Sequence, residues 1–258
     1  MIAAKTVLLA FSMFSAIPVR TKNADWSEKN LRFILCAFPL VGVAIGAAIF
    51  IAETIFRRFL QELFFLRAAI LTAIPVLFSG GIHLDGFCDT ADAISSHQSR
   101  EKMLEIMSDS RAGAFAVIFC ALYFVLYFSA TAELENTVPF IFAFVMERQL
   151  SALSVAVFPL AKNTGLAKMF ADSSARRAVI FSSTIGFFVL SAALIAIFGI
   201  SGFLVILPCV IAFGAYYVFS AQVFGGITGD LAGAFVQTAE LFCAIFSAAG
   251  GKIIQAHF

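Results

Sequence analysis

Apolar runs long enough to cross a bilayer recur along almost the whole chain, and they limit the fold more than any other feature. A helix of about 20 apolar residues spans the hydrocarbon core of a membrane. Hydrophobic residues make up 61% of the sequence and charged residues 13%, a balance far from that of soluble globular proteins. Because this character extends from end to end, residues 1–258 are predicted to form a single membrane-embedded domain.

The fold class follows from these runs: we predict an all-α, polytopic membrane helix bundle. About seven transmembrane helices are expected, near residues 33–56, 68–82, 113–132, 138–160, 179–199, 203–221 and 232–250. The segment before them, which ends at Pro18, is predicted to be an N-terminal helix in the membrane interface, in contact with lipid.

The basic residues are placed unevenly along the chain, which predicts its orientation. With the N-terminus in the cytoplasm, twelve Lys and Arg residues fall on the cytoplasmic side, and only Arg57, Arg58, Arg67 and Lys252 fall on the other side. The same arrangement places the polar segments 83–111, 161–178 and 225–230 together on the cytoplasmic side. The net charge of +1 provides no basic surface field, so no nucleic-acid partner is expected.

The strongest chemical signal is the group Asp85, Asp89 and Asp92. Their spacing puts three carboxylates on one narrow stripe of a helix. Unpaired negative charges at a membrane interface repel one another, and a hard divalent cation with oxygen ligands relieves that repulsion. We therefore predict a catalytic site for Mg²⁺, with Mn²⁺ as the alternative. Because Mg²⁺ usually binds phosphate oxygens as well as carboxylates, a diphosphate-containing substrate is expected.

Three residues flank this stripe. Asp109 is predicted to be a further metal ligand and Arg111 a catalytic phosphate clamp; the alternative is an ordinary salt bridge at the start of a helix. His83 is a candidate catalytic proton acceptor or substrate hydrogen-bonding residue, or else a structural histidine.

Ionisable side chains also interrupt two later apolar runs, where a bilayer disfavours them. Glu147 and Arg148 are predicted to lie beside the site and bind substrate, unless they only neutralise a buried charge. Asp230 follows a glycine-rich turn and is predicted to be a metal ligand that faces the first stripe across a two-metal site. Gln237 shares the helical face of Asp230, whereas Glu240 lies deeper and is expected to orient a neighbour; both are assigned to substrate binding.

At these residues the sequence resembles a known family. Three stretches resemble the signature blocks of the cobalamin synthase (adenosylcobinamide-GDP ribazoletransferase) family, namely His83–Asp92, Glu105–Phe115 and Gly226–Ala234. Phe38–Gly42 and Ile17–Arg20 are similar to its N-terminal blocks. The resemblance covers most of the chain, in order. It departs from the family pattern at Phe87, Cys88 and Ser95, where Leu, Ala and Gly are commoner, and these changes leave every proposed ligand in place.

The resemblance implies a Mg²⁺-dependent membrane enzyme with corrinoid and α-ribazole substrates. In the family's reaction, a hydroxyl of α-ribazole or of its 5′-phosphate attacks the cobinamide-side phosphorus of adenosylcobinamide-GDP and releases GMP. The resemblance further implies the cytoplasmic membrane of a bacterium or archaeon, an active site facing the cytoplasm, and other late B12-pathway enzymes as partners. Candidate phosphate or corrin contacts are Arg20, Arg111, Arg148 and Lys162.

Two other functions compete with this interpretation. A CDP-alcohol phosphotransferase also uses clustered aspartates on membrane helices, but its usual D-G-x2-A-R continuation is absent, because Phe87, Cys88 and Asp89 follow Gly86. A cation or proton transporter would also hold intramembrane carboxylates, but the acids cluster toward one side in polar segments with glycine turns, and the sequence shows no internal repeat with matching broken helices. A requirement for a corrinoid would exclude the first, and metal-dependent release of GMP would exclude the second.

Overall fold

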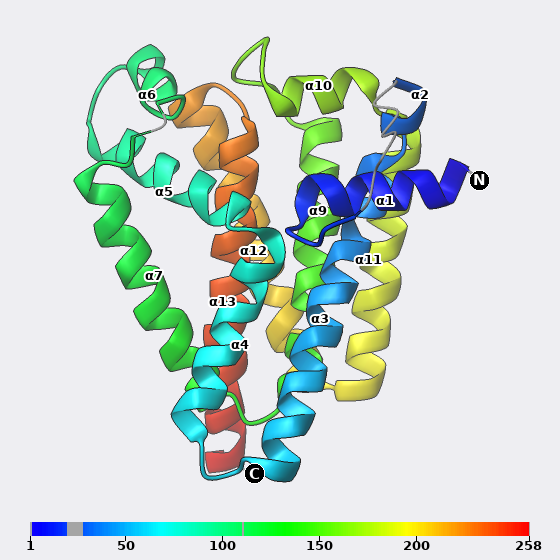
Figure 1. Cartoon of the computed structure of the whole chain (residues 1–258), viewed down its shortest axis with the longest axis vertical. Helices are drawn as coiled ribbons and strands as arrows, with labels where there is room; N and C mark the ends of the chain where they lie inside the picture. Colours follow the sequence, from blue (N-terminus) through cyan, green and yellow to red (C-terminus); the bar gives the residue numbers. More distant parts are fainter. Residues whose placement is uncertain (1, 20–27, 110, 258) are drawn as a thin grey trace.

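The computed structural model describes residues 2–19, 28–109 and 111–257, and these residues are overwhelmingly helical (Figure 1). An isolated bridge pairs Leu160 with Ile227. In chain order the elements are α1 (Ile2–Phe14), α2 (Glu28–Leu31), α3 (Ile34–Phe59), α4 (Phe64–Ser79), α5 (Ile82–Ser95), α6 (Arg100–Ile106), α7 (Ala114–Glu133), α8 (Thr137–Phe140), α9 (Ala143–Val157), α10 (Leu166–Ser173), α11 (Arg176–Phe198), α12 (Ile200–Phe219), a π-helix (Ser220–Phe224) and α13 (Gly229–His257).

The described residues contain six helical segments that are long and apolar enough to cross a membrane: α3, α7, α8 with α9, α11, α12 with the π-helix, and α13. The pair α4 and α5 adds a seventh if it is counted as one bent span. Figure 1 shows the long helices running roughly side by side, with α1 lying across one end of the bundle. The predicted all-α polytopic bundle with an N-terminal helix across its end is confirmed.

The second span differs from its predicted limits, 68–82, because the chain turns sharply inside them. α4 ends at Ser79, and α5 leaves it at an angle of 92°. Gly80 and Gly81 have φ values of +66° and +79°, and the Gly81 N–H donates to the Val76 carbonyl at 3.0 Å. Only glycine adopts this left-handed conformation without strain. The glycine pair therefore ends α4 and directs α5 across the bundle.

The N-terminal helix ends at Phe14, four residues before Pro18, where the sequence predicted its end. Beyond it, the Ala16 N–H donates to the Phe78 carbonyl at 2.7 Å, which fastens this segment to the last turn of α4. A residue that precedes proline is disfavoured in the helical conformation, which is consistent with the end of α1 before Pro18. The Ala16 N–H, which lies beyond the helix, is satisfied by the tertiary hydrogen bond to Phe78 instead of by a helical one.

The polar segments gather at one end of the molecule, which we call the polar end: α5, α6, α10 and the turn at residues 225–228 (Figure 1). The predicted convergence of residues 83–111, 161–178 and 225–230 is confirmed. The turns that join α3 to α4 and α7 to α8 lie at the opposite end.

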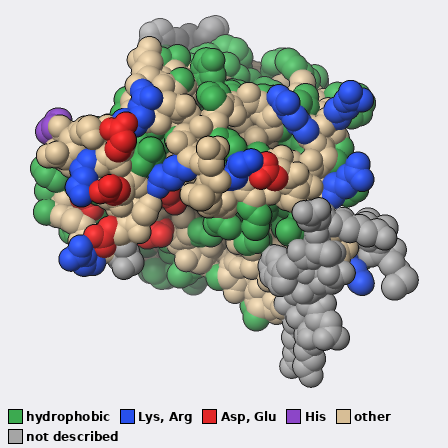
Figure 2. Space-filling view, turned by 90° about the horizontal axis from the view of Figure 1, so that it is seen from above, with side chains coloured by type: hydrophobic (Ala, Val, Ile, Leu, Met, Phe, Trp, Pro, Cys, Tyr) green, Lys and Arg blue, Asp and Glu red, His purple; other side chains and the backbone are tan. Residues whose placement is uncertain are grey.

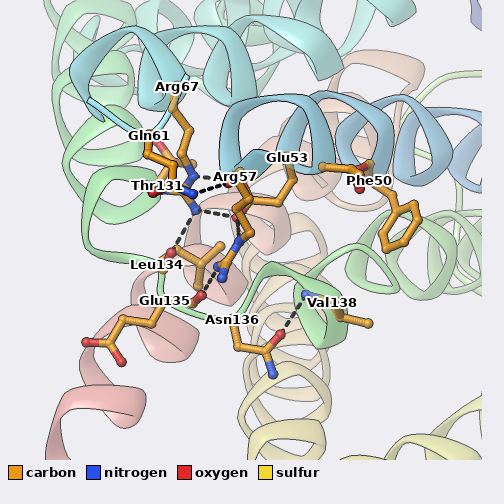
Figure 3. Close-up of polar contacts among 11 residues, drawn as sticks. Phe50, Glu53, Arg57, Gln61, Arg67, Thr131, Leu134, Glu135, Asn136 and Val138 are labelled. Atoms are coloured by element: carbon orange, nitrogen blue, oxygen red, sulfur yellow. Dashed lines mark hydrogen bonds and ion pairs between the residues drawn. The ribbon is translucent and has the colours of Figure 1, made fainter. Parts of the chain in front are cut away.

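The opposite end is held by a buried ion-pair cluster (Figure 3). Glu53, on α3, is 4% exposed and accepts hydrogen bonds from Arg67 of α4 at 2.6 and 3.1 Å, and also from Arg57. Arg67 donates in addition to the Leu134 carbonyl at 2.9 Å. One carboxylate and one guanidinium therefore join α3, α4 and the end of α7, far from the polar end.

We expect Glu53→Gln to lower the free energy of unfolding by about 3 kcal/mol or more, because it leaves the buried Arg67 charge without its anionic partner. Thermal unfolding of the purified protein in lipid measures this loss. Glu62→Gln, which changes an exposed carboxylate at the same end, is the matched control. Equal stability of the two variants would show that the cluster does not hold these helices together.

Candidate active site

The site begins with the contact between α5 and α13, whose backbones pack directly against each other at two glycines. A Cβ atom added at Gly86 would lie 2.6 Å from the backbone oxygen of Asp230, and one at Gly233 would lie 3.2 Å from the Cα atom of His83. Small residues allow membrane helices to approach this closely. The acidic stripe of α5 is therefore held beside the first turn of α13.

Three carboxylates lie near one another at this contact. Asp85 is exposed, Asp89 and Asp230 are half-buried, and Asp89 lies within electrostatic range of both others. None of the three forms an ion pair with a Lys or Arg side chain of the described residues. Figure 2 shows acidic side chains gathered over one side of the polar end, with Lys and Arg side chains among and around them. Asp230 therefore lies at the start of the helix that packs against α5, near Asp85 and Asp89, and the predicted roles of these three residues as metal ligands stay predictions.

Asp92, the third member of the predicted stripe, is engaged elsewhere. Its carboxylate accepts hydrogen bonds from the backbone N–H groups of Gly113, at 2.5 Å, and Ala116, at 2.8 Å. These groups belong to the unsatisfied first turn of α7, where an anion is stabilised by the helix dipole. A Cβ atom at Gly113 would lie 2.7 Å from this carboxylate, so the absence of a side chain at Gly113 allows the Asp92 carboxylate to approach the start of α7. Asp92 fastens α5 to α7, and its role as a metal ligand stays a prediction.

Asp109 and Arg111 pair with each other, which was the alternative considered for them. Arg111 donates to the Asp109 carboxylate through Nη2 at 2.7 Å and through its backbone N–H at 3.0 Å. These hydrogen bonds lower the pKa of Asp109 to about 2, so it is ionised at neutral pH. Arg111 is highly exposed, with 86% of its side chain accessible. Their roles as metal ligand and phosphate clamp stay predictions.

A cavity of about 360 Å³ opens beside Asp230. Its polar walls carry His83 from α5, Ser108 after α6, Lys162 and Thr164 from the loop before α10, and Thr228 and Asp230 at the start of α13. The Lys162 ammonium donates to the Leu104 carbonyl and to the Ser108 hydroxyl, both at 2.7 Å. A cation and a carboxylate thus share one cavity, as a site for a metal-bound phosphate requires.

Backbone pairing brings Lys162 to this cavity. The Ile227 N–H donates to the Pro159 carbonyl at 2.8 Å, and the Ala161 N–H donates to the Ile227 carbonyl at 2.9 Å. Gly226, with φ of +152°, allows the approach, because a Cβ atom there would lie 2.5 Å from the Pro159 oxygen. The turn that positions Asp230 therefore also positions Lys162. The sequence indicates Lys162 only as a candidate phosphate or corrin contact outside the strong motifs, and it contains no signal for Thr164.

His83 lines the same cavity. It is 7% exposed, its ring centroid lies 5.8 Å from that of Phe38, and its Nε2 atom has no hydrogen-bond partner among the described residues. A buried nitrogen without a partner is costly unless a ligand or water satisfies it. This position suits the predicted hydrogen bond between His83 and a substrate, which itself stays a prediction.

Glu147, Arg148, Gln237 and Glu240 lie deeper, between the helices, and are almost completely buried. Arg148 donates to Glu147 at 2.5 Å, and Gln237 donates to Glu240 at 3.5 Å. The Arg148 guanidinium lies 5.7 Å from the centre of the Phe38 ring, and Phe38 lines the cavity while these four residues do not. Arg148 therefore lies behind the Phe38 part of the cavity wall, and the predicted role of all four residues in substrate binding stays a prediction. Arg20, the remaining candidate contact, lies outside the described residues.

The donor set fits a hard divalent cation. Asp85, Asp89 and Asp230 offer carboxylate oxygens that form no ion pair with a described Lys or Arg side chain, and carboxylate oxygens are the ligands that Mg²⁺ and Mn²⁺ prefer. In the described residues, no three Asp, Glu, His or Cys side chains gather closely enough to hold an ion by themselves. Mg²⁺ sites commonly use only one or two carboxylates, with phosphate oxygens and water completing the shell. The arrangement is therefore one that a phosphorylated substrate would complete.

Comparison with known proteins identifies relatives along almost the whole chain. The family described as cobalamin-5-phosphate synthase matches residues 6–248. An adenosylcobinamide-GDP ribazoletransferase of Lachnoclostridium phytofermentans is 40% identical, over 92% of this chain and 90% of that protein. An enzyme of the same name from Geobacillus kaustophilus is 34% identical, over 90% of this chain and 91% of that protein. Another, from Pseudomonas aeruginosa, is 32% identical, over 95% of this chain and 98% of that protein. No solved structure matches this fold. The chain belongs to the cobalamin-5-phosphate synthase family.

Proposed function

We propose that this enzyme transfers the adenosylcobinamide phosphate group of adenosylcobinamide-GDP to α-ribazole or α-ribazole 5′-phosphate, with release of GMP. The products are adenosylcobalamin or its 5′-phosphate. The family match over residues 6–248 carries the proposal. The site supports it, because a cavity lined by Lys162 and Asp230, with Asp85 and Asp89 near Asp230, suits a nucleotide diphosphate.

In the proposed reaction, a ribazole hydroxyl oxygen forms a bond to the phosphorus on the cobinamide side. The bond from that phosphorus to the bridging oxygen breaks, and GMP leaves with the bond's electron pair. Asp85, Asp89 and Asp230 would hold Mg²⁺, which neutralises diphosphate charge and stabilises the leaving phosphate when bound. The hydroxyl proton passes to a base, for which His83, with its unpartnered Nε2, and a site carboxylate are the candidates.

The test measures GMP release by the purified protein in lipid, given adenosylcobinamide-GDP and α-ribazole, with and without Mg²⁺. GMP release that needs both α-ribazole and Mg²⁺ supports the proposal. Mn²⁺ is expected to replace Mg²⁺ in part. Release of CMP from a CDP-alcohol, with no corrinoid present, would instead favour a lipid phosphotransferase. The absence of release from a folded, lipid-supported sample would contradict a transferase of this kind.

We further propose that the protein lies in the cytoplasmic membrane with the polar end in the cytoplasm. The distribution of basic residues supports this orientation, because Lys102, Arg111, Lys162 and Arg176 lie on that side and Arg58 on the other. Labelling of single-cysteine variants at Lys102 and Arg58 in intact cells tests it. A membrane-impermeant maleimide is expected to label position 58 and to leave position 102 unlabelled.

Lys162 is expected to bind a phosphate oxygen of the nucleotide substrate. Lys162→Ala should raise KM for adenosylcobinamide-GDP by about tenfold, the value of one charge-assisted hydrogen bond, while the melting temperature changes little. Steady-state kinetics with a thermal melt measures both quantities. Lys168→Ala, which removes an ammonium paired with Asp172 on α10, is the matched control. A fall in melting temperature with an unchanged KM would assign Lys162 to fastening Leu104 and Ser108 instead.

A further inference from the structure

A second cavity, of about 400 Å³, lies against the other side of α5, away from the acidic stripe. α5, α7, α12 and α13 enclose it. The residues that α5 contributes include Phe87, Thr90 and Ile94, which are roughly opposite Asp85 and Asp89 on the helix. One face of α5 therefore borders the acidic site and the other borders this cavity.

The walls of this cavity are apolar and largely aromatic. Side chains from all four helices contribute, namely Phe87, Phe119, Tyr216, Phe219, Phe235 and Phe242. The Tyr216 and Phe235 rings stack with their centroids 5.0 Å apart. The Thr90 hydroxyl has a hydrogen-bond partner within α5, because it donates to the Gly86 carbonyl at 2.7 Å. Such walls fit an apolar occupant, since an apolar cavity of roughly 150 Å³ stays free of water and still binds benzene.

The cavity opens sideways onto the surface that faces lipid. Two of its wall residues, Phe119 on α7 and Ile94 on α5, are 40% and 37% exposed. Their neighbours on the outer faces of α7 and α12 are large, exposed hydrophobic residues such as Leu122 and Val210. The bilayer itself therefore lies at the mouth of the cavity and supplies the most abundant apolar ligand.

We propose that a phospholipid acyl chain from the bilayer enters between α7 and α12 and occupies this cavity. The continuity of the cavity with the lipid-facing surface and the apolar, largely aromatic walls favour a hydrocarbon over a charged ligand. The acyl chain supplies dispersion contacts that the cavity walls would otherwise lack. It thereby supports α5 on the face opposite Asp85 and Asp89. This inference does not rest on the proposed reaction.

A photoreactive phospholipid tests the proposal. The full-length protein is reconstituted with phosphatidylglycerol that carries a diazirine near the end of one acyl chain, and the labelled residues are mapped by mass spectrometry. We expect labels on Phe87, Phe235 or Tyr216, which lie behind the exposed rim. Labels confined to outward-facing residues such as Leu122 would overturn the proposal.

Two variants sharpen the test. Ala234→Leu fills the cavity from α13, and Ala215→Phe blocks its exposed rim without entering the core. Each should lower labelling inside the cavity by about tenfold, and Ala121→Leu, on the outer face of α7, should leave it unchanged. Because Ala215 is exposed, its variant keeps the test valid if Ala234→Leu fails to fold.

A competition experiment separates the lipid from a small aromatic ligand. Addition of 5,6-dimethylbenzimidazole, a planar base, should leave the labelling of Phe87 and Phe235 unchanged. Loss of this labelling as the base is added would overturn the proposal in favour of an aromatic substrate group. In parallel, added phospholipid should raise the melting temperature of the detergent-purified protein, and by a smaller amount for Ala234→Leu.

Discussion

Asn in place of Asp85, Asp89 or Asp230 is expected to lower the rate of GMP release by about 1000-fold, with the protein still folded and inserted. The three carboxylates are near one another, and none forms an ion pair with a described Lys or Arg side chain, although Lys162 lies in the cavity beside Asp230. Removing one charge therefore mainly lowers the repulsion among the carboxylates. Steady-state GMP release and a thermal melt of each variant in lipid measure the two effects.

Glu105→Gln is the control for these variants. Glu105 is an exposed acid on α6 that pairs with Lys102 at the same end of the molecule, so its loss should leave turnover unchanged. Full activity of any one of the three Asn variants would remove that residue from the site. Loss of folding in all three would assign the cluster a structural role.

Gly86→Ala is expected to damage both stability and turnover, because its Cβ atom would meet the Asp230 backbone oxygen at 2.6 Å. Relief requires α5 and α13 to move apart, at a cost of about 1–3 kcal/mol in the free energy of unfolding. The same movement separates Asp85 and Asp89 from Asp230, and a misplacement of about 1 Å in a catalytic constellation lowers turnover roughly 100-fold.

Gly214→Ala provides the matched control, since a Cβ atom added there on α12 would have no atom of another helix within 4 Å. This control should retain activity and gain slightly in stability, because Ala is the better helix former. Added Mg²⁺ should not rescue Gly86→Ala, because the backbone has moved. Normal activity of Gly86→Ala would show that the close contact between α5 and α13 does not position the carboxylates.

The sequence predicted the helical bundle well because a bilayer imposes local rules. Each crossing segment must be apolar over about 20 residues, so hydropathy located the six unbent spans of the described residues, and the positions of the polar segments and basic residues located the polar end. The helical period likewise placed Asp85 and Asp89 on one stripe. The bend of 92° between α4 and α5 was missed, although Gly80 and Gly81 provided its signal, because the adjoining apolar residues read as one continuous span.

The sequence by itself therefore determined the class of protein, its spans and its candidate carboxylates, since these depend on hydropathy and on spacing within one helix. The tertiary structure decided which groups meet. It set Asp230 beside Asp89, gave Asp92 to the first turn of α7, and brought Lys162 into the cavity through backbone pairing. Such contacts join residues far apart in the chain, and they depend on how closely glycines let two backbones approach, which no local pattern encodes.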